Sequence, residues 1–190
     1  MKDNQEIPLG KTKWNTNFEL NDEEWENIFS LPFKLTKNTK LQWFQFRINH
    51  KILSTNSFLY KIKIKDTEKC TFCNTETETI EHILWECEVV QELLNDFDTF
   101  CFDKTHFHVT YNKKDFILGS CMRSENIKAL MSLQAKYFIY SMKCQNKNIS
   151  LLGLISSIKS MYEINKEIAI KNNKKESFDE AWDGWSNLFI

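Results

Sequence analysis

Three cysteines and one histidine lie close together in the stretch CTFCNTETETIEHILWEC, which covers residues 70–87. Their spacing is C-x2-C-x8-H-x4-C, formed by Cys70, Cys73, His82 and Cys87. Thiolate and imidazole groups are ligands that Zn²⁺ prefers, and Zn²⁺ usually takes four of them in a tetrahedron. A C-x2-C pair can form a tight turn that points both sulfur atoms at one centre. We therefore predict one zinc ion, which is structural because four protein ligands leave no position for water.

Two alternatives to zinc stay open for this stretch. In the first, Cys70 and Cys73 are surface thiols and His82 is an ordinary helix histidine. In the second, the C-x2-C pair is a redox pair, although the βαβ pattern that accompanies such pairs is not visible. A second metal site is also considered on four residues of irregular spacing, Cys101, His106, His108 and Cys121.

The zinc site needs a helix to position its second pair of ligands. Thr75 and Glu78 have the spacing of a capping box, which predicts a helix from about residue 76 to 86. Its buried face would consist of Ile80, Ile83 and Leu84. His82 and Cys87 are five positions apart, about 140° around an ideal α-helix. Both side chains can reach one ion only if the last turn of the helix unwinds near Cys87.

The composition of the whole chain favours helices. The chain has 190 residues, with 15 Phe, 6 Trp and 5 Tyr but only 4 Gly and 2 Pro. Such a chain can bury a large core, and the scarcity of Gly and Pro argues against disorder and against a turn-rich β fold. We predict a mainly α fold, a helical domain with a small CCHC zinc-binding knuckle and at most a short β element. The expected organisation is a flexible arm (1–21), a zinc-binding domain (22–100) and a C-terminal helical region (101–190).

Local patterns place the individual helices. Asn21 and the acids after it predict a short helix from about 22 to 30, stopped by Pro32. A second helix is predicted from the apolar stripe Leu41, Phe44, Ile48 and Ile52. Long amphipathic patterns predict further helices at 126–144 and 149–172. The stripe of the first of these consists of Ile127, Leu130, Leu133, Tyr137, Tyr140 and Cys144.

Two shorter segments carry more specific expectations. In residues 60–65, apolar side chains alternate with lysines, which predicts a short strand or extended segment. A helical turn at 56–61, leading into this segment, is also considered. Near the end of the chain, Ser177 and Glu180 have the spacing of a capping box for the last helix.

The charge of the chain changes sign at the zinc-site stretch. Residues 34–69 contain nine basic and two acidic residues, whereas residues 70–103 contain nine acidic residues and no Lys or Arg. Such a difference predicts one surface for an anionic partner and another that repels it. Two of the acids, Glu78 and Glu81, are either hydrogen-bond partners of His82 or solvated helix acids.

The basic stretch contains the candidate nucleic-acid contacts. Cationic side chains neutralise phosphates, and exposed aromatic rings can stack on unpaired bases. The candidates are the cations Arg47, Lys51, Lys61, Lys63 and Lys65, with Trp43 as a stacking surface. In the alternative interpretation, Trp43 belongs to the core and the lysines form an ordinary solvated face.

The run LQWFQFRINHKIL, followed by TNSFLYKIKI and CTFCNTETETIEHILWEC, resembles the zinc-binding region that follows the polymerase in LINE-type (non-LTR) retrotransposon reverse transcriptases. The resemblance extends more loosely through AKYFIY and YEINKEIA and covers most of residues 25–190. It implies that the zinc ligands are Cys70, Cys73, His82 and Cys87. It also implies a role in gripping template RNA or target DNA. Polymerase chemistry needs paired aspartates that hold two metal ions, and the chain has no Asp-Asp dipeptide.

The sequence thus predicts a zinc-stabilised module that binds RNA or single-stranded DNA and is not an enzyme. The alternative is a structural or protein-interaction domain that docks to the polymerase segment of a retroelement polyprotein. The first residues, MKDNQEIPLG, contain no apolar run, and no stretch approaches the roughly 18 consecutive apolar residues of a membrane span. We therefore expect an intracellular protein of the nucleus or cytoplasm, neither secreted nor bound to a membrane.

Overall fold

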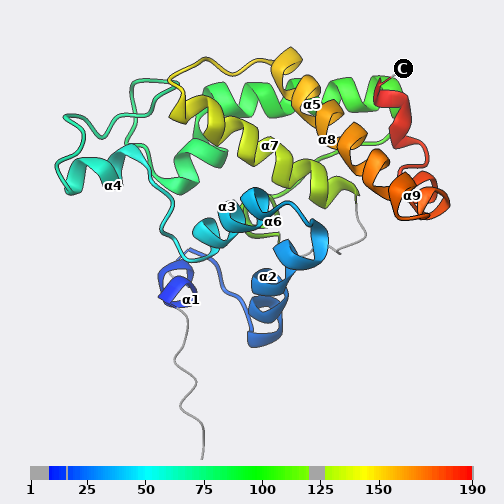
Figure 1. The fold of residues 1–190 in the computed structure, drawn as a ribbon. Helices are drawn as coiled ribbons and strands as arrows, with labels where there is room; N and C mark the ends of the chain where they lie inside the picture. Colours follow the sequence, from blue (N-terminus) through cyan, green and yellow to red (C-terminus); the bar gives the residue numbers. More distant parts are fainter. Residues whose placement is uncertain (1–8, 16, 120–126, 190) are drawn as a thin grey trace, which may run out of the picture.

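The computed structural model describes residues 9–15, 17–119 and 127–189, and these residues are mostly helical (Figure 1). The helices are α1 (Leu9–Trp14), α2 (Asp22–Leu35), α3 (Thr39–Asn49), α4 (Asn56–Lys61), α5 (Glu88–Thr105), α6 (Lys113–Leu118), α7 (Ile127–Cys144), α8 (Leu151–Lys171) and α9 (Lys175–Ala181). A π-helix, η1 (His82–Glu86), and a 3₁₀-helix, η2 (Trp185–Phe189), complete the set. Among the described residues, β structure is limited to an isolated bridge between Lys69 and Thr77. The predicted mainly α class is confirmed.

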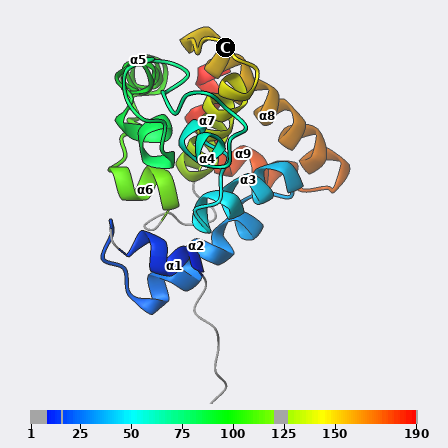
Figure 2. The same ribbon diagram turned by 90° about the vertical axis from the view of Figure 1, so that its left-hand side faces the viewer.

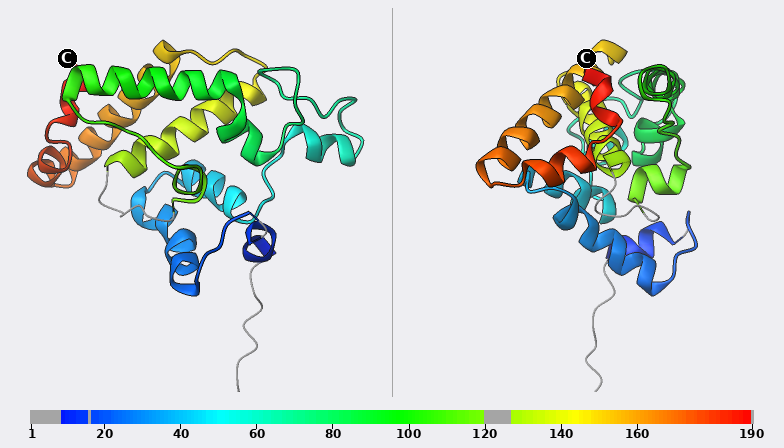
Figure 3. Two further views of the ribbon diagram at one scale, coloured as in Figure 1. Left: turned by 180° about the vertical axis from the view of Figure 1, so that it is seen from behind. Right: turned by 90° about the vertical axis from the view of Figure 1, so that its right-hand side faces the viewer.

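The long helices pack on one another and on a second group of shorter helices. α7 contacts α8 and α3, and α5 contacts α8 and η1. In Figure 1, α2 and α3 lie below α7, while α4 and α9 lie at opposite ends of the molecule. Figure 2 looks onto the α4 end, and Figure 3 shows η2 against the end of α5 from behind. One cluster of buried apolar side chains extends through these helices.

The N-terminal residues that the structure describes are part of the fold, so the expectation of a loose arm is wrong for them. The indole of Trp14 is 0% exposed, and its Nε1 donates to the carbonyl oxygen of Ile48 at 3.0 Å. Gly10 lies so close to Asn49 that an added Cβ would be 2.1 Å from its carbonyl oxygen. A buried aromatic ring therefore holds α1 on α3. The rest of the predicted arm, residues 1–8 and 16, lies outside the described part of the chain.

Helix α2 begins as predicted but does not stop at Pro32. The predicted N-cap Asn21 is confirmed, and the structure adds a reciprocal capping box between Asn21 and Glu24. The helix continues to Leu35, although proline cannot donate to the carbonyl oxygen four residues earlier. That oxygen belongs to Ile28, and it accepts instead from the Nδ2 atom of Asn49 at 2.9 Å. A side chain of α3 thus replaces the backbone hydrogen bond that the proline removes.

The predicted strand at residues 60–65 is wrong, and the helical turn considered at 56–61 is present as α4. α4 is capped by Thr55, whose hydroxyl accepts from the amide of Phe58. Ile62 and Ile64 follow this helix in turns and are exposed, so their alternation with lysines does not reflect a half-buried sheet. Ile52, predicted for the stripe of α3, is also exposed because α3 ends at Asn49.

The C-terminal helices follow the predicted ranges closely, with two local differences. Cys144, which the sequence analysis placed on the apolar stripe of the helix at 126–144, is exposed because it is the last residue of α7 and precedes an exposed segment at 145–148. Ser177 forms no cap, since α9 already begins at Lys175. α5 crosses the predicted boundary between residues 100 and 101 without interruption, and the division into two regions stays a prediction.

Candidate metal centre

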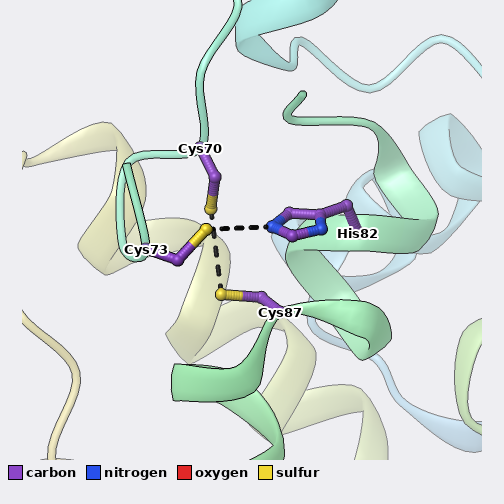
Figure 4. Close-up of side chains that lie close together, drawn as sticks. All are labelled: Cys70, Cys73, His82 and Cys87. Atoms are coloured by element: carbon purple, nitrogen blue, oxygen red, sulfur yellow. Dashed lines mark hydrogen bonds between the residues drawn. The ribbon is translucent and has the colours of Figure 1, made fainter. Parts of the chain in front are cut away.

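The structure brings the four sequence-predicted ligands together in one cluster (Figure 4). Their ligand atoms all lie within 4.8 Å of one another. The Sγ atoms of Cys70 and Cys87 are 3.9 Å apart, and Sγ of Cys73 lies 3.4 Å from Nε2 of His82. A tetrahedral zinc ion with ordinary bond lengths separates two sulfurs by about 3.8 Å and a sulfur from a nitrogen by about 3.6 Å. Two of the ligand pairs thus have separations close to those of a tetrahedral site, and the four residues could hold a metal ion.

The first pair of ligands lies in a tight loop, as the C-x2-C spacing predicts. The amide of Cys70 donates to the carbonyl oxygen of Glu76 at 2.8 Å, and the amide of Asn74 donates back to the carbonyl oxygen of Cys70 at 3.0 Å. Asn74 adopts a left-handed conformation, with φ of 57°, which lets the chain reverse after Cys73. We call residues 69–78 the ligand loop.

The second pair is positioned by a different helix from the one predicted. The helix does not begin near residue 76, because the chain becomes helical only at Ile80, and Thr75 donates its hydroxyl to Sγ of Cys73 rather than capping. The predicted buried face is confirmed: Ile80, Ile83 and Leu84 are all buried.

On an ideal α-helix the side chains of His82 and Cys87 would point about 140° apart. In the structure a wider, π-helical turn removes this offset. The amide of Cys87 donates to the carbonyl oxygen of His82 at 2.8 Å, which closes the π-helix η1. A π turn pairs residues five apart, so it brings both ligands round to one side. The prediction that the α-helix must be interrupted near Cys87 is right, but the interruption is a wider winding and not an unwound end. Cys87 then adopts an extended conformation and begins α5.

Hydrogen bonds shape the acidity of the four ligands. The pKa of Cys87 is lowered, mainly because the thiol of Cys70 donates to its sulfur, whereas the same contact together with burial raises the pKa of Cys70. Burial acts to raise the pKa of Cys73, but the amide of Glu76 and the hydroxyl of Thr75 outweigh it and lower that pKa. Two of the three sulfurs are thus favoured as thiolates, the form that binds metal.

The pKa of His82 is shifted in the opposite direction from those of Cys73 and Cys87. Burial acts to lower its pKa, but the hydrogen bond with Cys73 and the nearby sulfur of Cys70 outweigh it, and the pKa is raised. Its backbone amide donates to the hydroxyl of Thr79 at 3.0 Å, which fixes the residue at the start of η1. A metal ligand must be unprotonated, so metal binding here would displace a proton from this ring.

The two acids that the sequence offered as partners of His82 or as solvated charges are neither. Glu78 is 0% exposed and accepts from the amide and the hydroxyl of Thr71. Glu81 is 7% exposed and lies 2.8 Å from the Nζ atom of Lys51. Both carboxylates therefore connect the ligand segment to other parts of the chain.

The candidate nucleic-acid contacts fall into two groups. Lys61, Lys63 and Lys65 are exposed, and Trp43 is 63% exposed, so it is not a core residue. Lys51 is engaged, because its Nζ atom pairs with Glu81 and also lies 4.3 Å from the ring centroid of Trp14. Arg47 is partly buried, and its Nε atom has no hydrogen-bond partner in the described part of the molecule. The structure thus leaves the three lysines and Trp43 open to a partner.

The second candidate metal site was Cys101, His106, His108 and Cys121. The three of these residues that the structure describes do not form a metal-binding cluster. Cys101 is buried, and burial raises its pKa to about 12. His108 is exposed, and its Nδ1 lies 2.8 Å from the carboxylate of Asp98. Cys121 lies outside the described residues. Within the described ranges, the cluster that could hold a metal is the one at Cys70.

Two buried lysines of α7 were missed by the sequence reasoning. Lys136 is 3% exposed, and its Nζ donates to Oε1 of Gln45 at 2.6 Å and to the carbonyl oxygen of Ile117 at 3.1 Å. Burial lowers the pKa of Lys136 to about 7. Lys143 is 7% exposed. The sequence could have indicated their burial, since each lysine lies three residues after a member of the apolar stripe and therefore on the same helix face.

The described residues form a helical domain that carries a Cys₃His cluster, an arrangement typical of small zinc-binding modules. Residues 10–93 match the family model described as zinc-binding in reverse transcriptase. The predicted resemblance to a reverse-transcriptase zinc-binding region is therefore confirmed over this segment, which contains all four ligands. None of the curated proteins and none of the solved structures matches the chain. No helix of the described residues is long and apolar enough to span a membrane.

Proposed function

We propose that the chain is a zinc-stabilised nucleic-acid-binding module of a LINE-type reverse transcriptase. Two findings support this proposal: the family model that covers residues 10–93, and the Cys₃His cluster inside that segment. The matched model describes a zinc-binding segment and not a polymerase. The function expected from it is to hold a nucleic-acid strand and not to react with it.

One structural zinc ion would be bound by Cys70, Cys73, His82 and Cys87. With all four positions taken by protein atoms, the ion supplies no reactive water and acts as a cross-link. It would join the ligand loop to the start of α5, two segments that the chain otherwise connects only through η1. Such a cross-link contributes directly to the free energy of folding.

The observation that carries the nucleic-acid proposal is the surface of residues 56–65, which we call the basic protrusion. It comprises α4 and the turn after it, at one end of the molecule (Figures 1 and 2). Lys61, Lys63 and Lys65 are all exposed there, and Phe58 and Tyr60 are each 47% exposed. Exposed cations beside exposed rings are the two elements of sequence-tolerant binding to single strands.

A second candidate function is docking to the polymerase segment of the parent polyprotein. A groove of about 730 Å³ lies between the α2–α3 connection, α7, α8 and α9. Its wall includes Ile164, which is 60% exposed, and its rim includes Lys34 and Lys37. An apolar groove of this size with cations at its rim suits a segment that carries apolar and acidic side chains.

A salt titration tests the nucleic-acid proposal. Binding to an unstructured RNA oligonucleotide should weaken as salt rises, with a log–log slope of about −0.7 per neutralised phosphate. The triple variant Lys61→Glu, Lys63→Glu, Lys65→Glu should lower the magnitude of that slope by about 2, since three contacts are lost. The matched control changes three other exposed lysines, Lys147, Lys171 and Lys174, to Glu.

Equal loss of affinity in both triple variants would show that only net charge matters and would contradict a contact on the basic protrusion. An oligodeoxynucleotide of the same sequence separates RNA binding from general single-strand binding. A pull-down with a polymerase fragment, with and without nuclease, distinguishes docking to the polymerase from binding through nucleic acid. Capture that survives nuclease while the RNA titration shows no binding favours docking.

A further inference from the structure

The buried carboxylate of Glu78 lies where the ligand loop meets the base of the basic protrusion. Its Oε2 accepts from the amide of Thr71 at 2.8 Å and from the hydroxyl of Thr71 at 2.7 Å. Its Oε1 accepts from the amide of Asn56 at 2.7 Å. Thr71 directly follows the ligand Cys70, and Asn56 is the first residue of α4. A single carboxylate therefore bridges the metal-binding turn and the start of the protrusion.

The first turn of α4 takes from Glu78 the acceptors for two of its unpaired backbone amides, while the hydroxyl of Thr55 accepts from a third. The first amides of a helix have no partner within the helix and need acceptors from elsewhere. The amide of Asn56 donates to the carboxylate of Glu78, and the amide of Ser57 donates to the backbone carbonyl oxygen of Glu78 at 3.3 Å. A carboxylate at this end also complements the helix dipole. Loss of the Glu78 carboxylate would leave the amide of Asn56 without its acceptor, whereas the amide of Ser57 would keep the backbone carbonyl oxygen.

The side chain of Asn56 reinforces the same junction. Its Nδ2 atom donates to the carbonyl oxygen of Lys69 at 2.7 Å and to the hydroxyl of Thr71 at 3.2 Å. Both acceptors belong to the ligand loop. The amide of Glu78 in turn donates to the carbonyl oxygen of Glu68 at 2.8 Å. The base of the protrusion is thus held by the loop that carries Cys70 and Cys73.

A third element, α7, supplies the charge that balances the carboxylate. The Nζ atom of Lys143 lies 3.4 Å from Oε1 of Glu78, and the two side chains are 4% and 0% exposed. The same Nζ donates to the carbonyl oxygen of Ser54 at 2.7 Å, just before α4. A buried ion pair is sensitive to displacement of either partner, because the remaining charge is left uncompensated. The carboxylate is therefore held from three sides, by Thr71, Asn56 and Lys143.

We propose that Glu78 is a positioning residue that couples metal binding to the orientation of the basic protrusion. Closure of the ligand loop around a metal ion places the two donors of Thr71, these donors place the carboxylate, and the carboxylate holds the first turn of α4. A metal ion held by the four ligands would thus fix the orientation of the protrusion lysines through the ligand loop and Glu78, without contact with nucleic acid. The consequence for RNA rests on the proposed function, whereas the coupling itself does not.

Hydrogen–deuterium exchange of the full chain, with zinc and after chelation, tests the coupling. In the wild-type protein, chelation should accelerate exchange of the α4 amides by about tenfold or more, as expected for loss of hydrogen bonds to a charged group. In Glu78→Gln, the α4 amides should exchange rapidly with or without zinc, while metal content stays at the wild-type level. Glu76→Gln is the matched control, since it alters an exposed acid of the same loop.

Amides of α8 serve as an internal reference, because a merely structural defect would accelerate them together with α4. Thr71→Val keeps the shape of the side chain and removes one donor, so it should give an intermediate acceleration even if Glu78→Gln does not fold. The coupling is overturned if α4 exchange is unchanged by chelation, or if Glu78→Gln behaves like Glu76→Gln.

An RNA titration of the same variants distinguishes failure of the coupling from failure of the proposed function. If both hold, Glu78→Gln with zinc should bind RNA about tenfold more weakly than wild type, as should the chelated wild-type protein. Absence of RNA binding by the wild type, with the exchange coupling intact, would reject the proposed function alone. Wild-type RNA affinity in Glu78→Gln with accelerated α4 exchange would reject the consequence for RNA.

Discussion

The amide of Cys87 donates to the carbonyl oxygen of His82 at 2.8 Å, so the last two residues of the metal cluster are joined by one wide helical turn. In an ordinary α-helix these side chains would point in directions about 140° apart. The π turn removes that offset, and Cys87 at once begins α5. The local winding of the backbone is therefore matched to the metal cluster and not to regular helix geometry.

Metal binding should follow from this arrangement with a stoichiometry of one ion per chain. Titration with Co²⁺, which accepts the same tetrahedral ligands, should produce thiolate charge-transfer absorption that saturates at about one equivalent. His82→Ala should weaken the affinity by at least about tenfold, because one of four ligands is lost. Cys144→Ser should leave the titration unchanged, since that thiol is exposed at the end of α7. Saturation at two equivalents would contradict a single site.

Zinc should stabilise the fold by an amount that grows with the logarithm of its free concentration. Above the dissociation constant, each tenfold increase in buffered free zinc should raise the free energy of unfolding by about 1.4 kcal/mol. Urea unfolding in a series of zinc buffers measures this slope. The free energy of unfolding of the double variant Cys70→Ser, Cys73→Ser should not change with the zinc concentration. A wild-type protein with no slope would show that the cluster does not bind the ion in the folded state.

Buried Lys136 should make stability depend on pH in a defined window. Its pKa is about 7 in the folded protein, whereas an unfolded lysine has a pKa near 10.4. Between these values the unfolded chain binds a proton that the folded chain does not, so the free energy of unfolding rises with pH. The slope is up to about 1.4 kcal/mol per pH unit. Urea unfolding at pH 7, 8 and 9 should show this contribution in the wild type and not in Lys136→Met; equal slopes would contradict it.

A buried and an exposed tryptophan should differ sharply in their contribution to stability. Trp14→Ala should lower the free energy of unfolding by about 3–5 kcal/mol, because a fully buried ring is lost. Trp43→Ala should lower it by less than about 1 kcal/mol, because 63% of that residue is exposed. Denaturant unfolding of both variants measures the difference. Similar losses would mean that α1 is not held on α3 by Trp14.

The amino-acid sequence was sufficient for features that depend on spacing and local pattern. The four ligands were identified because a Cys₃His set has few interpretations other than a metal site. The N-cap Asn21 and the buried stripe of α7 follow from the sequence because both lie within one helix, where period and capping residues act locally. The need for a break in the helix between His82 and Cys87 followed from the angle alone.

Only the tertiary structure decided features that depend on contacts between distant segments. Glu78 is a buried bridge and not a solvated acid because Asn56 and Lys143, far from it in the sequence, surround its carboxylate. Lys51 pairs with Glu81 and is lost as a candidate phosphate contact, although its neighbours in sequence are basic. Burial and charge pairing are properties of the packed chain. A pattern of residue types therefore predicts the ligands of the site but not the residues that hold it in place.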